Sequence, residues 1–213
     1  MTDKRSVSNP LALAVLALLF ERPMHPYEMA TTLREREKEQ SIKLRFGSLY
    51  SVIDRLQEEG LIRAGERVRE GKRPERTVYH ITENGTAEMR DWLRDLVSTP
   101  AKEYPQFEAA LSLLPVLPPD EAMEMLELRV ELLDAMLEEI DARHEKASEM
   151  AVPELFMIES DYRRAMIECE INWIKTTLDR MSDESWADVV LMEGIPTWRQ
   201  MHEMRGGGDR LDT

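Results

Sequence analysis

The chain has 213 residues, of which 42% are hydrophobic and 33% are charged, so it can bury a core in one large or two small domains. This composition excludes a chain that is disordered throughout. The formal net charge of −14 argues against nucleic-acid binding only if it is spread evenly. Residues 1–98 carry 17 basic and 16 acidic side chains, whereas residues 99–213 carry 11 and 26. The acidity therefore belongs to the C-terminal half, and the N-terminal half remains compatible with an anionic partner.

An apolar run at residues 11–20 follows two basic residues and imitates the hydrophobic part of a secretory signal. The run is about half of a membrane span, and charged residues follow it where a signal has small residues and a cleavage site. We therefore interpret it as a buried helix of a cytoplasmic protein that has no membrane partner. The single cysteine, Cys169, excludes an internal disulfide and a zinc ribbon, and we interpret it as a core residue. The four histidines are scattered, so we expect no metal and no cofactor.

In the first half of the chain, the pattern predicts three helices, a β-hairpin and a fourth helix. The first helix follows Asn9-Pro10, and the second begins near Pro26. The third carries an apolar stripe at Phe46, Leu49, Ile53 and Leu56 and stops at Gly60. Residues 62–69 and 76–82 alternate as strands, and Thr82 suits the N-cap of the fourth helix. Three helices and a basic hairpin are typical of a winged helix, so we expect a winged-helix domain over residues 1–98.

The second half is predicted to be wholly helical, with a dimerisation domain over residues 99–205 and a disordered tail at 206–213. The helix after residue 119 has a heptad seam that needs a partner helix, and residues 153–181 carry two apolar stripes. A second copy of the chain is the expected source of some of these neighbours. The fold class is thus mainly α with a small β-hairpin, and the predicted dimerisation residues are Leu126, Val130, Leu133, Leu137 and Ile140.

Polar and basic residues in the third helix and the hairpin suit contact with DNA. Short serine side chains on the third helix allow close approach to a groove, and an arginine one turn later has the reach for a guanine edge or a phosphate. In residues 63–76, six basic side chains outnumber three acidic ones, which suits phosphate contact at the hairpin. The candidate DNA-binding residues are Lys43, Ser48, Tyr50, Ser51, Arg55, Lys72, Arg73 and Arg76.

Three stretches of the sequence, residues 23–29, residues 47–56 with 59–62, and residues 73–85, together resemble the PadR-type transcriptional regulators, in particular the larger subgroup with a C-terminal helical dimerisation domain. The chain departs from the family in having Pro26 where Gly is common and Ser51 where Pro is common. The resemblance implies a homodimeric repressor that binds a near-palindromic operator on double-stranded DNA and is released by a small molecule, although relatives include activators. The matching stretches are Pro-Met-His-Pro-Tyr-Glu-Met at 23–29, Gly-Ser-Leu-Tyr-Ser-Val-Ile-Asp-Arg-Leu at 47–56 with Glu-Gly-Leu-Ile at 59–62, and Arg-Pro-Glu-Arg-Thr-Val-Tyr-His-Ile-Thr-Glu-Asn-Gly at 73–85.

Four aromatic residues, Trp92, Phe107, Tyr162 and Trp173, are candidates for an apolar pocket where the two domains meet, and core packing is the alternative for each. Such a pocket would take a small aromatic or antibiotic-like effector. Two other functions stay open beside the regulator. An enzyme is disfavoured because the sequence has no phosphate-binding glycine loop, nucleophile elbow or metal-ligand cluster. A helical dimer that binds a ligand or a protein but no DNA is disfavoured by the basic residues of the hairpin.

Overall fold

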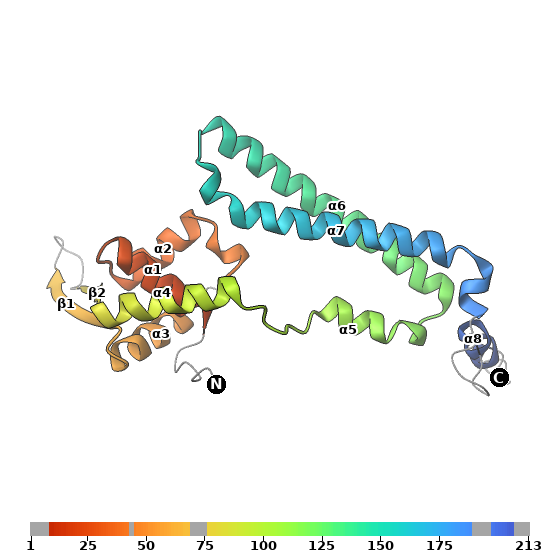
Figure 1. The fold of residues 1–213 in the computed structure, drawn as a ribbon, viewed down its shortest axis with the longest axis horizontal. Helices are drawn as coiled ribbons and strands as arrows, with labels where there is room; N and C mark the ends of the chain where they lie inside the picture. Colours follow the sequence, from red (N-terminus) through yellow and green to blue (C-terminus); the bar gives the residue numbers. More distant parts are fainter. Residues whose placement is uncertain (1–8, 43–44, 69–75, 189–196, 207–213) are drawn as a thin grey trace, which may run out of the picture. The chain divides into compact units, whose positions relative to one another are not determined.

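A computed structural model of the chain describes residues 9–42, 45–68, 76–188 and 197–206 (Figure 1). The chain divides into two compact units, Met1–Glu103 and Tyr104–Thr213. In the described ranges no helix is long and apolar enough to cross a membrane. Unit 1 contains α1 (Pro10–Glu21), α2 (Pro26–Glu35), the 3-10 helix η1 (Lys38–Gln40), α3 (Phe46–Glu58), β1 (Ile62–Val68), β2 (Arg76–Ile81) and α4 (Glu83–Ser98). Unit 2 contains α5 (Gln106–Ser112), η2 (Leu114–Val116), α6 (Pro119–Glu149), η3 (Glu154–Phe156), α7 (Ile158–Met181), η4 (Glu184–Asp188) and α8 (Trp198–Gly206).

The first two helices begin where the sequence supplies both a capping side chain and a proline. The Asn9 side chain accepts a hydrogen bond from the backbone N–H of Leu11, and Pro10 opens α1. His25 accepts from the N–H of Glu28 through Nδ1 at 3.0 Å, and a proline again opens the helix. Proline is tolerated in the first turn because its missing N–H has no partner within the helix. These caps set where the helices begin and which faces they turn to the core.

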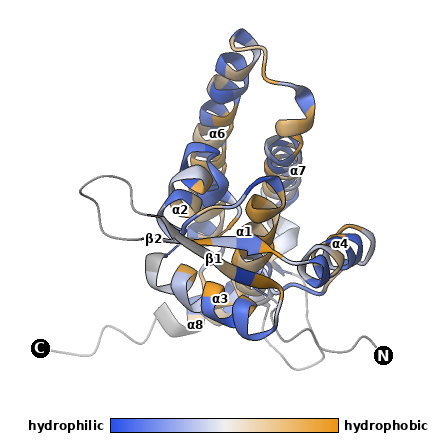
Figure 2. Ribbon diagram, turned by 90° about the vertical axis from the view of Figure 1, so that its left-hand side faces the viewer, coloured by the Kyte–Doolittle hydropathy of each residue, from blue (hydrophilic) through white to orange (hydrophobic). Residues whose placement is uncertain are grey.

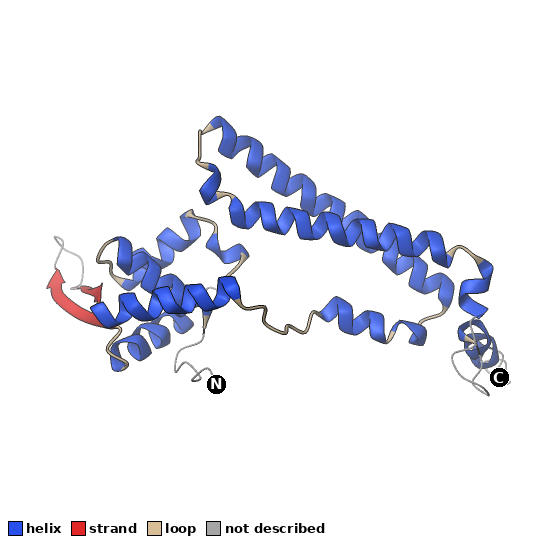
Figure 3. Ribbon diagram, viewed as in Figure 1, coloured by secondary structure: helices blue, strands red, loops and turns tan. Residues whose placement is uncertain are grey.

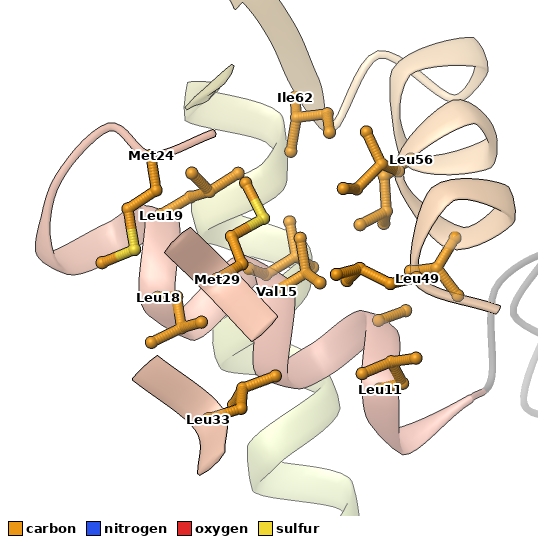
Figure 4. Packing of buried hydrophobic residues seen from close by; sticks show 14 of the residues in the cluster. Leu11, Val15, Leu18, Leu19, Met24, Met29, Leu33, Leu49, Leu56 and Ile62 are labelled. Carbon is orange, nitrogen blue, oxygen red and sulfur yellow. The ribbon is translucent and has the colours of Figure 1, made fainter. Parts of the chain in front are cut away.

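The core of unit 1 is formed by apolar side chains from α1, α2, α3, α4 and the first residue of β1 (Figure 4). The apolar run at residues 11–20 is confirmed as a buried helix: it lies within α1, and most of its large side chains are buried. On α3 the predicted stripe is confirmed as buried at Leu49, Ile53 and Leu56, and the side chain of Phe46 lies outside the described residues. The fully or almost fully buried residues of α3 are Leu49, Val52, Ile53 and Leu56.

The β-hairpin of unit 1, which we call the wing (residues 62–81), consists of two antiparallel strands (Figure 3). Ile62 pairs with Ile81, and the register shifts between Ala64 and Arg67. This shift interrupts the strict two-residue alternation that we predicted along β1. On its other side, β2 forms an isolated antiparallel bridge from Tyr79 to Met24, just before α2.

Thr82 joins the end of α3, the wing and α4. Its hydroxyl lies 2.8 Å from the carbonyl oxygen of Gly60 and 3.0 Å from that of Leu61, to which it can donate. The same oxygen accepts from the N–H of Gly85 in the first turn of α4. Gly60 has a φ of 69°, a left-handed conformation that glycine adopts without strain. The N-cap predicted at Thr82 is therefore present, and it also fixes α4 against the turn after α3.

In unit 2, α6 and α7 form an antiparallel pair joined by a short turn, which we call the helical hairpin (Figure 1). Around α6, hydrophilic and hydrophobic residues alternate (Figure 2). The heptad seam of α6 packs against Ile167, Ile171 and Ile174 of α7 in the same chain. Within the single chain α7 thus covers the seam, and the predicted role of the seam in the dimer contact stays a prediction. The residues of this prediction are Leu126, Val130, Leu133, Leu137 and Ile140, of which all but the half-buried Leu137 are buried in the single chain.

The second apolar stripe that we predicted in residues 153–181 remains exposed in the single chain. Tyr162, Met166 and Trp173 are all exposed, and so is Leu155 before α7. Cys169 is exposed on the same helix, so its interpretation as a core residue is wrong. Residues on this side of α7 have no helix of the same hairpin facing them, because α6 covers only the isoleucine stripe.

The last described helix, α8, is held on the corner between α5 and α6. Trp198 is buried, and its indole N–H donates to the carbonyl oxygen of Leu117 at 2.7 Å. Trp186 lies edge-on to the Trp198 ring with 5.9 Å between ring centroids. Gly206, where we expected a disordered tail to begin, is the last residue of α8. Residues 207–213 of that predicted tail lie outside the described residues.

Candidate nucleic-acid interface

The face of α3 that is turned away from the core carries the predicted polar residues. Tyr50 is 53% exposed, Ser51 and Arg55 are exposed, and Ser48 is half-buried. Ser48, Ser51 and Arg55 follow one another at spacings of three and four residues, so they lie on one side of the helix. No side chain caps the first turn of α3, where Arg45 occupies the N-cap position. The structure thus presents one short polar surface with a single long cation at its C-terminal end.

The hydroxyl of Ser51 donates to the carbonyl oxygen of Gly47 one turn earlier, at 3.1 Å. This bond within the helix occupies the only hydrogen that the hydroxyl has. Ser51 can then accept a hydrogen bond from a base edge directly, but it can donate one only after leaving Gly47. The serine is therefore better prepared to accept from an amino group than to donate to a ring nitrogen or a carbonyl.

Acidic residues interrupt this surface. Asp54 and Glu58 are exposed on α3, and negative charge there opposes the approach of phosphates. Burial raises the pKa of the Tyr79 phenol above its ordinary value, and the charges of Asp54 and Tyr50 raise it further. Tyr79 is therefore a neutral hydrogen-bond donor between α3 and the base of the wing. Sequence reasoning assigned it to a strand but missed this position, because no local pattern places it beside Asp54.

Only part of the predicted basic set lies in the described residues. Lys43, Lys72 and Arg73 lie outside them, and Arg76 is the first residue of β2, opposite Val68. Arg63 at the base of the wing is exposed. The role of the wing and of Lys43 in phosphate contact therefore stays a prediction.

The candidate effector residues are divided between the two units. Trp92 is buried in the core of unit 1, whereas the other three belong to unit 2. Phe107 of α5 and Trp173 of α7 meet edge to face with 6.3 Å between ring centroids. Tyr162 is 69% exposed, three helical turns before Trp173. The structure thus brings Phe107 and Trp173 together, and the predicted pocket between the domains stays a prediction.

An ion pair beside these two rings was missed by sequence reasoning. The guanidinium carbon of Arg129 on α6 lies 3.7 Å from the centroid of the Phe107 ring. Its Nε donates to Glu170 of α7 at 2.6 Å. Arg129 and Glu170 are 41 residues apart in the chain, so no local sequence motif predicts this ion pair. It ties α5, α6 and α7 together through a cation–π contact and a charge-assisted hydrogen bond.

The sequence of unit 1 matches a known family of regulators. The model of the transcriptional regulator PadR-like family matches residues 15–91, which run from α1 into α4. The region from α1 into α4 is thus similar to the PadR-like family. The described elements of that region are helices and a two-stranded antiparallel sheet.

Proteins of known sequence and structure are similar to this chain. The negative transcriptional regulator PadR of Bacillus subtilis (strain 168) is 24% identical over 146 residues, which make up 68% of this chain and 79% of that protein. The crystal structure of Bacillus subtilis PadR in complex with operator DNA superposes with a TM-score of 0.65 at 19% identity, covering 81% of this chain and 99% of that one. The same protein in complex with p-coumaric acid gives a TM-score of 0.64 at 18% identity, covering 84% and 100% of the two chains. These likenesses confirm the predicted fold class, a winged helix with a small β-hairpin followed by further helices.

Proposed function

We propose that this PadR-like protein is a repressor that acts as a homodimer on a near-palindromic operator. In this proposal α3 is the recognition helix in the major groove and the tip of the wing contacts the neighbouring backbone. The observation that carries the proposal is the polar face of α3, where Ser51 and Arg55 are exposed and Ser48 is half-buried. The helix itself packs against β1 of the basic wing.

The distribution of charge supports contact through unit 1. Residues 1–98 are almost neutral overall, and six basic side chains in residues 63–76 concentrate positive charge at the wing. Residues 99–213 carry 26 acidic side chains and would be repelled by phosphates. Few base-contacting groups stand on α3, so specificity depends in part on the shape and deformability of the operator.

The dimer contact, in our proposal, uses an exposed face of the helical hairpin and not the heptad seam. Arg129 and Glu170 contact each other across α6 and α7, so residues three or four positions from either one flank that contact on the same face. On α6 this face includes Leu132 and Met136, three and seven positions after Arg129. The apolar hairpin face, as we call it, consists of Met125, Leu132, Met136, Met166 and Trp173, all of them exposed in the single chain.

A second copy of the chain is the occupant that fits this face. A soluble monomer rarely exposes so many large apolar side chains along one side of a helical pair. Binding both halves of a near-palindrome requires two reading heads related by twofold symmetry. The face lies on unit 2, which leaves α3 and the wing of each copy available for DNA.

A small aromatic or antibiotic-like effector is the proposed signal for release. Bacillus subtilis PadR has been crystallised with p-coumaric acid, an aromatic carboxylic acid. In this chain Phe107, Trp173 and Arg129 offer two rings and a cation at the start of unit 2. An effector that changes the distance between the two reading heads from one helical turn of DNA, about 34 Å, would lower operator affinity because both half-sites no longer fit.

The test begins with the selection of bound fragments from the genome of the source organism, followed by footprinting. Arg55→Ala should weaken binding of the selected operator by about 1–3 kcal/mol. Arg94→Ala is the matched control, because Arg94 is exposed on α4 and pairs with Asp91 in its own helix. A protein that retains no fragment at low ionic strength would instead support a helical module without DNA binding.

The sign of regulation is measured with a reporter gene placed behind the selected operator. Removal of the protein should raise expression if it is a repressor, and lower expression identifies an activator of the same fold. Alanine at Lys72, Arg73 and Arg76 together should weaken binding to all DNA sequences and reduce the salt slope by about one for each phosphate that is no longer neutralised. An unchanged slope would remove the tip of the wing from the interface.

A further inference from the structure

The wing contains a β-bulge near its base. Ala64 pairs with Tyr79, but the next pair on the far side of the shift is Arg67 with Thr77. Two residues of β1 therefore stand opposite one residue of β2, which is the definition of a bulge. Such an insertion bends the strand and increases its twist, so it decides in which direction the rest of the wing continues.

Gly65 occupies the bulge because another side chain fills the space where its Cβ would be. A Cβ built on Gly65 would lie 2.5 Å from Nε2 of His80 and 3.2 Å from the carbonyl oxygen of Val78. The backbone of Gly65 is not left-handed, so the reason for glycine is close approach and not conformation. His80 is half-buried and pairs with Arg63, so its ring reaches Gly65 from the neighbouring strand.

The bulge also decides which residues of the wing stand opposite each other. If the pairing of Ala64 with Tyr79 continued without a shift, Arg67 would stand opposite Arg76. With the shift, Thr77 stands opposite Arg67, and Val68 stands opposite Arg76. Like charges directly opposite each other in an antiparallel pair are destabilising. In the shifted register Arg67 and Arg76 are therefore not Cα partners across the ladder.

The second strand is held from its other side, so β1 must absorb any change of register. The N–H of Tyr79 donates to the carbonyl oxygen of Met24 at 2.9 Å, and the N–H of Met24 donates back at 3.3 Å. β2 is therefore anchored to the start of α2, while the outer half of β1 pairs only with β2. We therefore expect a disturbance at Gly65 to displace the outer half of β1 more than β2.

We propose that Gly65 and His80 are positioning residues that fix the register of the wing for DNA binding. The His80 ring, seated on Gly65, keeps the bulge in place, and the bulge keeps Arg67 and Arg76 on different rungs of the ladder. Neither Gly65 nor His80 needs to touch DNA for this role. The inference rests on the proposed function, because it concerns how the wing meets phosphates.

The experiment compares the wild type with Gly65→Ala, His80→Ala and the double variant, using the full-length dimer and the selected operator. Gly65→Ala should displace the ring and weaken operator binding about fivefold, with a salt slope lower by about one. His80→Ala should weaken operator binding about twofold, because Gly65 can still form the bulge but the imidazole ring no longer packs against it. The double variant should recover most of the affinity of His80→Ala, since the added methyl group then meets no ring and only the carbonyl oxygen of Val78 remains close, at 3.2 Å.

Two results would overturn the inference. One is wild-type affinity and salt slope for Gly65→Ala, and the other is a double variant as weak as Gly65→Ala itself. Thermal unfolding of each variant separates a loss of fold from a loss of wing position. NMR contacts between the α-protons of opposing strands report the register without DNA, and Gly65→Ala should lose the pairing of Arg67 with Thr77. If the wild type binds no DNA, the proposed function fails, but this register measurement still decides the role of Gly65.

Discussion

Two neighbouring leucines on α6 provide the sharpest test of how unit 2 is built. Leu133 is 7% exposed and packs against α7, whereas Leu132 is 60% exposed on the apolar hairpin face. Leu133→Ala should destabilise the helical hairpin of each copy. Leu132→Ala should leave the fold of each copy intact and weaken the association of two copies. Because the two substitutions are chemically identical and adjacent, each is the control for the other.

The expected magnitudes follow from burial. A buried leucine replaced by alanine costs about 2–5 kcal/mol of the free energy of unfolding, which applies to Leu133. Burying a whole leucine side chain is worth about 1.5–3 kcal/mol. The exposed 60% of Leu132 then has about 1–2 kcal/mol to gain from a partner. Both copies carry the substitution, so the dimer loses about 2–4 kcal/mol, and its Kd rises by between roughly 30-fold and several hundred-fold.

The assay is urea unfolding combined with sedimentation at a series of protein concentrations. The fluorescence of Trp173, Trp186 and Trp198 reports on unit 2, and that of Trp92 reports on unit 1. Leu133→Ala should lower the unfolding midpoint of unit 2 even at protein concentrations where the dimer is dissociated. Leu132→Ala should lower it only at concentrations where the wild type is dimeric, because association stabilises the folded state by mass action.

A reversed pattern would refute this assignment of the two leucines. If Leu132→Ala destabilised the isolated chain as much as Leu133→Ala, both leucines would belong to one intrachain core. If Leu133→Ala dissociated the dimer without changing the stability of the monomer, the heptad seam would be the dimer contact after all. Unchanged sedimentation of Leu132→Ala at all concentrations would remove the apolar hairpin face from the interface.

Three further predictions concern single side chains. Gly85→Ala should lower the free energy of unfolding by about 1–3 kcal/mol, because a Cβ there would lie 2.0 Å from the carbonyl oxygen of Leu61. Gly47→Ala is its control, because a Cβ at Gly47 would meet nothing within 4 Å. It should raise the stability measured by thermal unfolding by about 0.5–1 kcal/mol. Burial raises the pKa of the Tyr79 phenol above 10.0, so its contribution to stability is complete below the unfolded pKa and is lost as the pH rises through the folded one. Urea unfolding of unit 1 should therefore lose stability above about pH 10, and Tyr79→Phe should lose less; an identical pH profile contradicts this. Trp198→Phe should cost about 1–3 kcal/mol in urea unfolding of unit 2, because the carbonyl oxygen of Leu117 loses its donor, and wild-type stability would show that α8 contributes nothing.

The helices of unit 1 could be predicted from the sequence because their boundaries and buried faces depend on residues close together in the chain. α1 and α2 begin at prolines with capping side chains before them. Gly60 follows the end of α3, and Thr82 is the N-cap of α4. The spacing of apolar residues predicts the buried stripe of α3, since one face of a helix repeats every three or four residues. The same spacing places Ser48, Ser51 and Arg55 on the opposite side. Such signals require only residues that are neighbours along the chain.

The bulge at Gly65 shows where short-range reasoning stops within unit 1. Strict alternation is the simplest pattern for a strand, and the residues of β1 follow it well enough to suggest a regular ladder. The ring of His80, 15 positions later, occupies the space beside Gly65. Only the pairing of the two strands brings them together, so the register could not be obtained from either strand alone.

Unit 2 shows most clearly which features the sequence determines and which depend on tertiary packing. Periodicity alone established that α6 and α7 are long helices and that each needs apolar neighbours. Periodicity carries no information about which molecule supplies the neighbour, because an apolar stripe is equally satisfied by a helix of the same chain or of another. The tertiary structure decided that α7 covers the seam of Leu133 and leaves the side of Leu132 exposed. It also brought Arg129 onto Phe107 and Glu170, since contacts between residues distant in the chain exist only once the helices have packed.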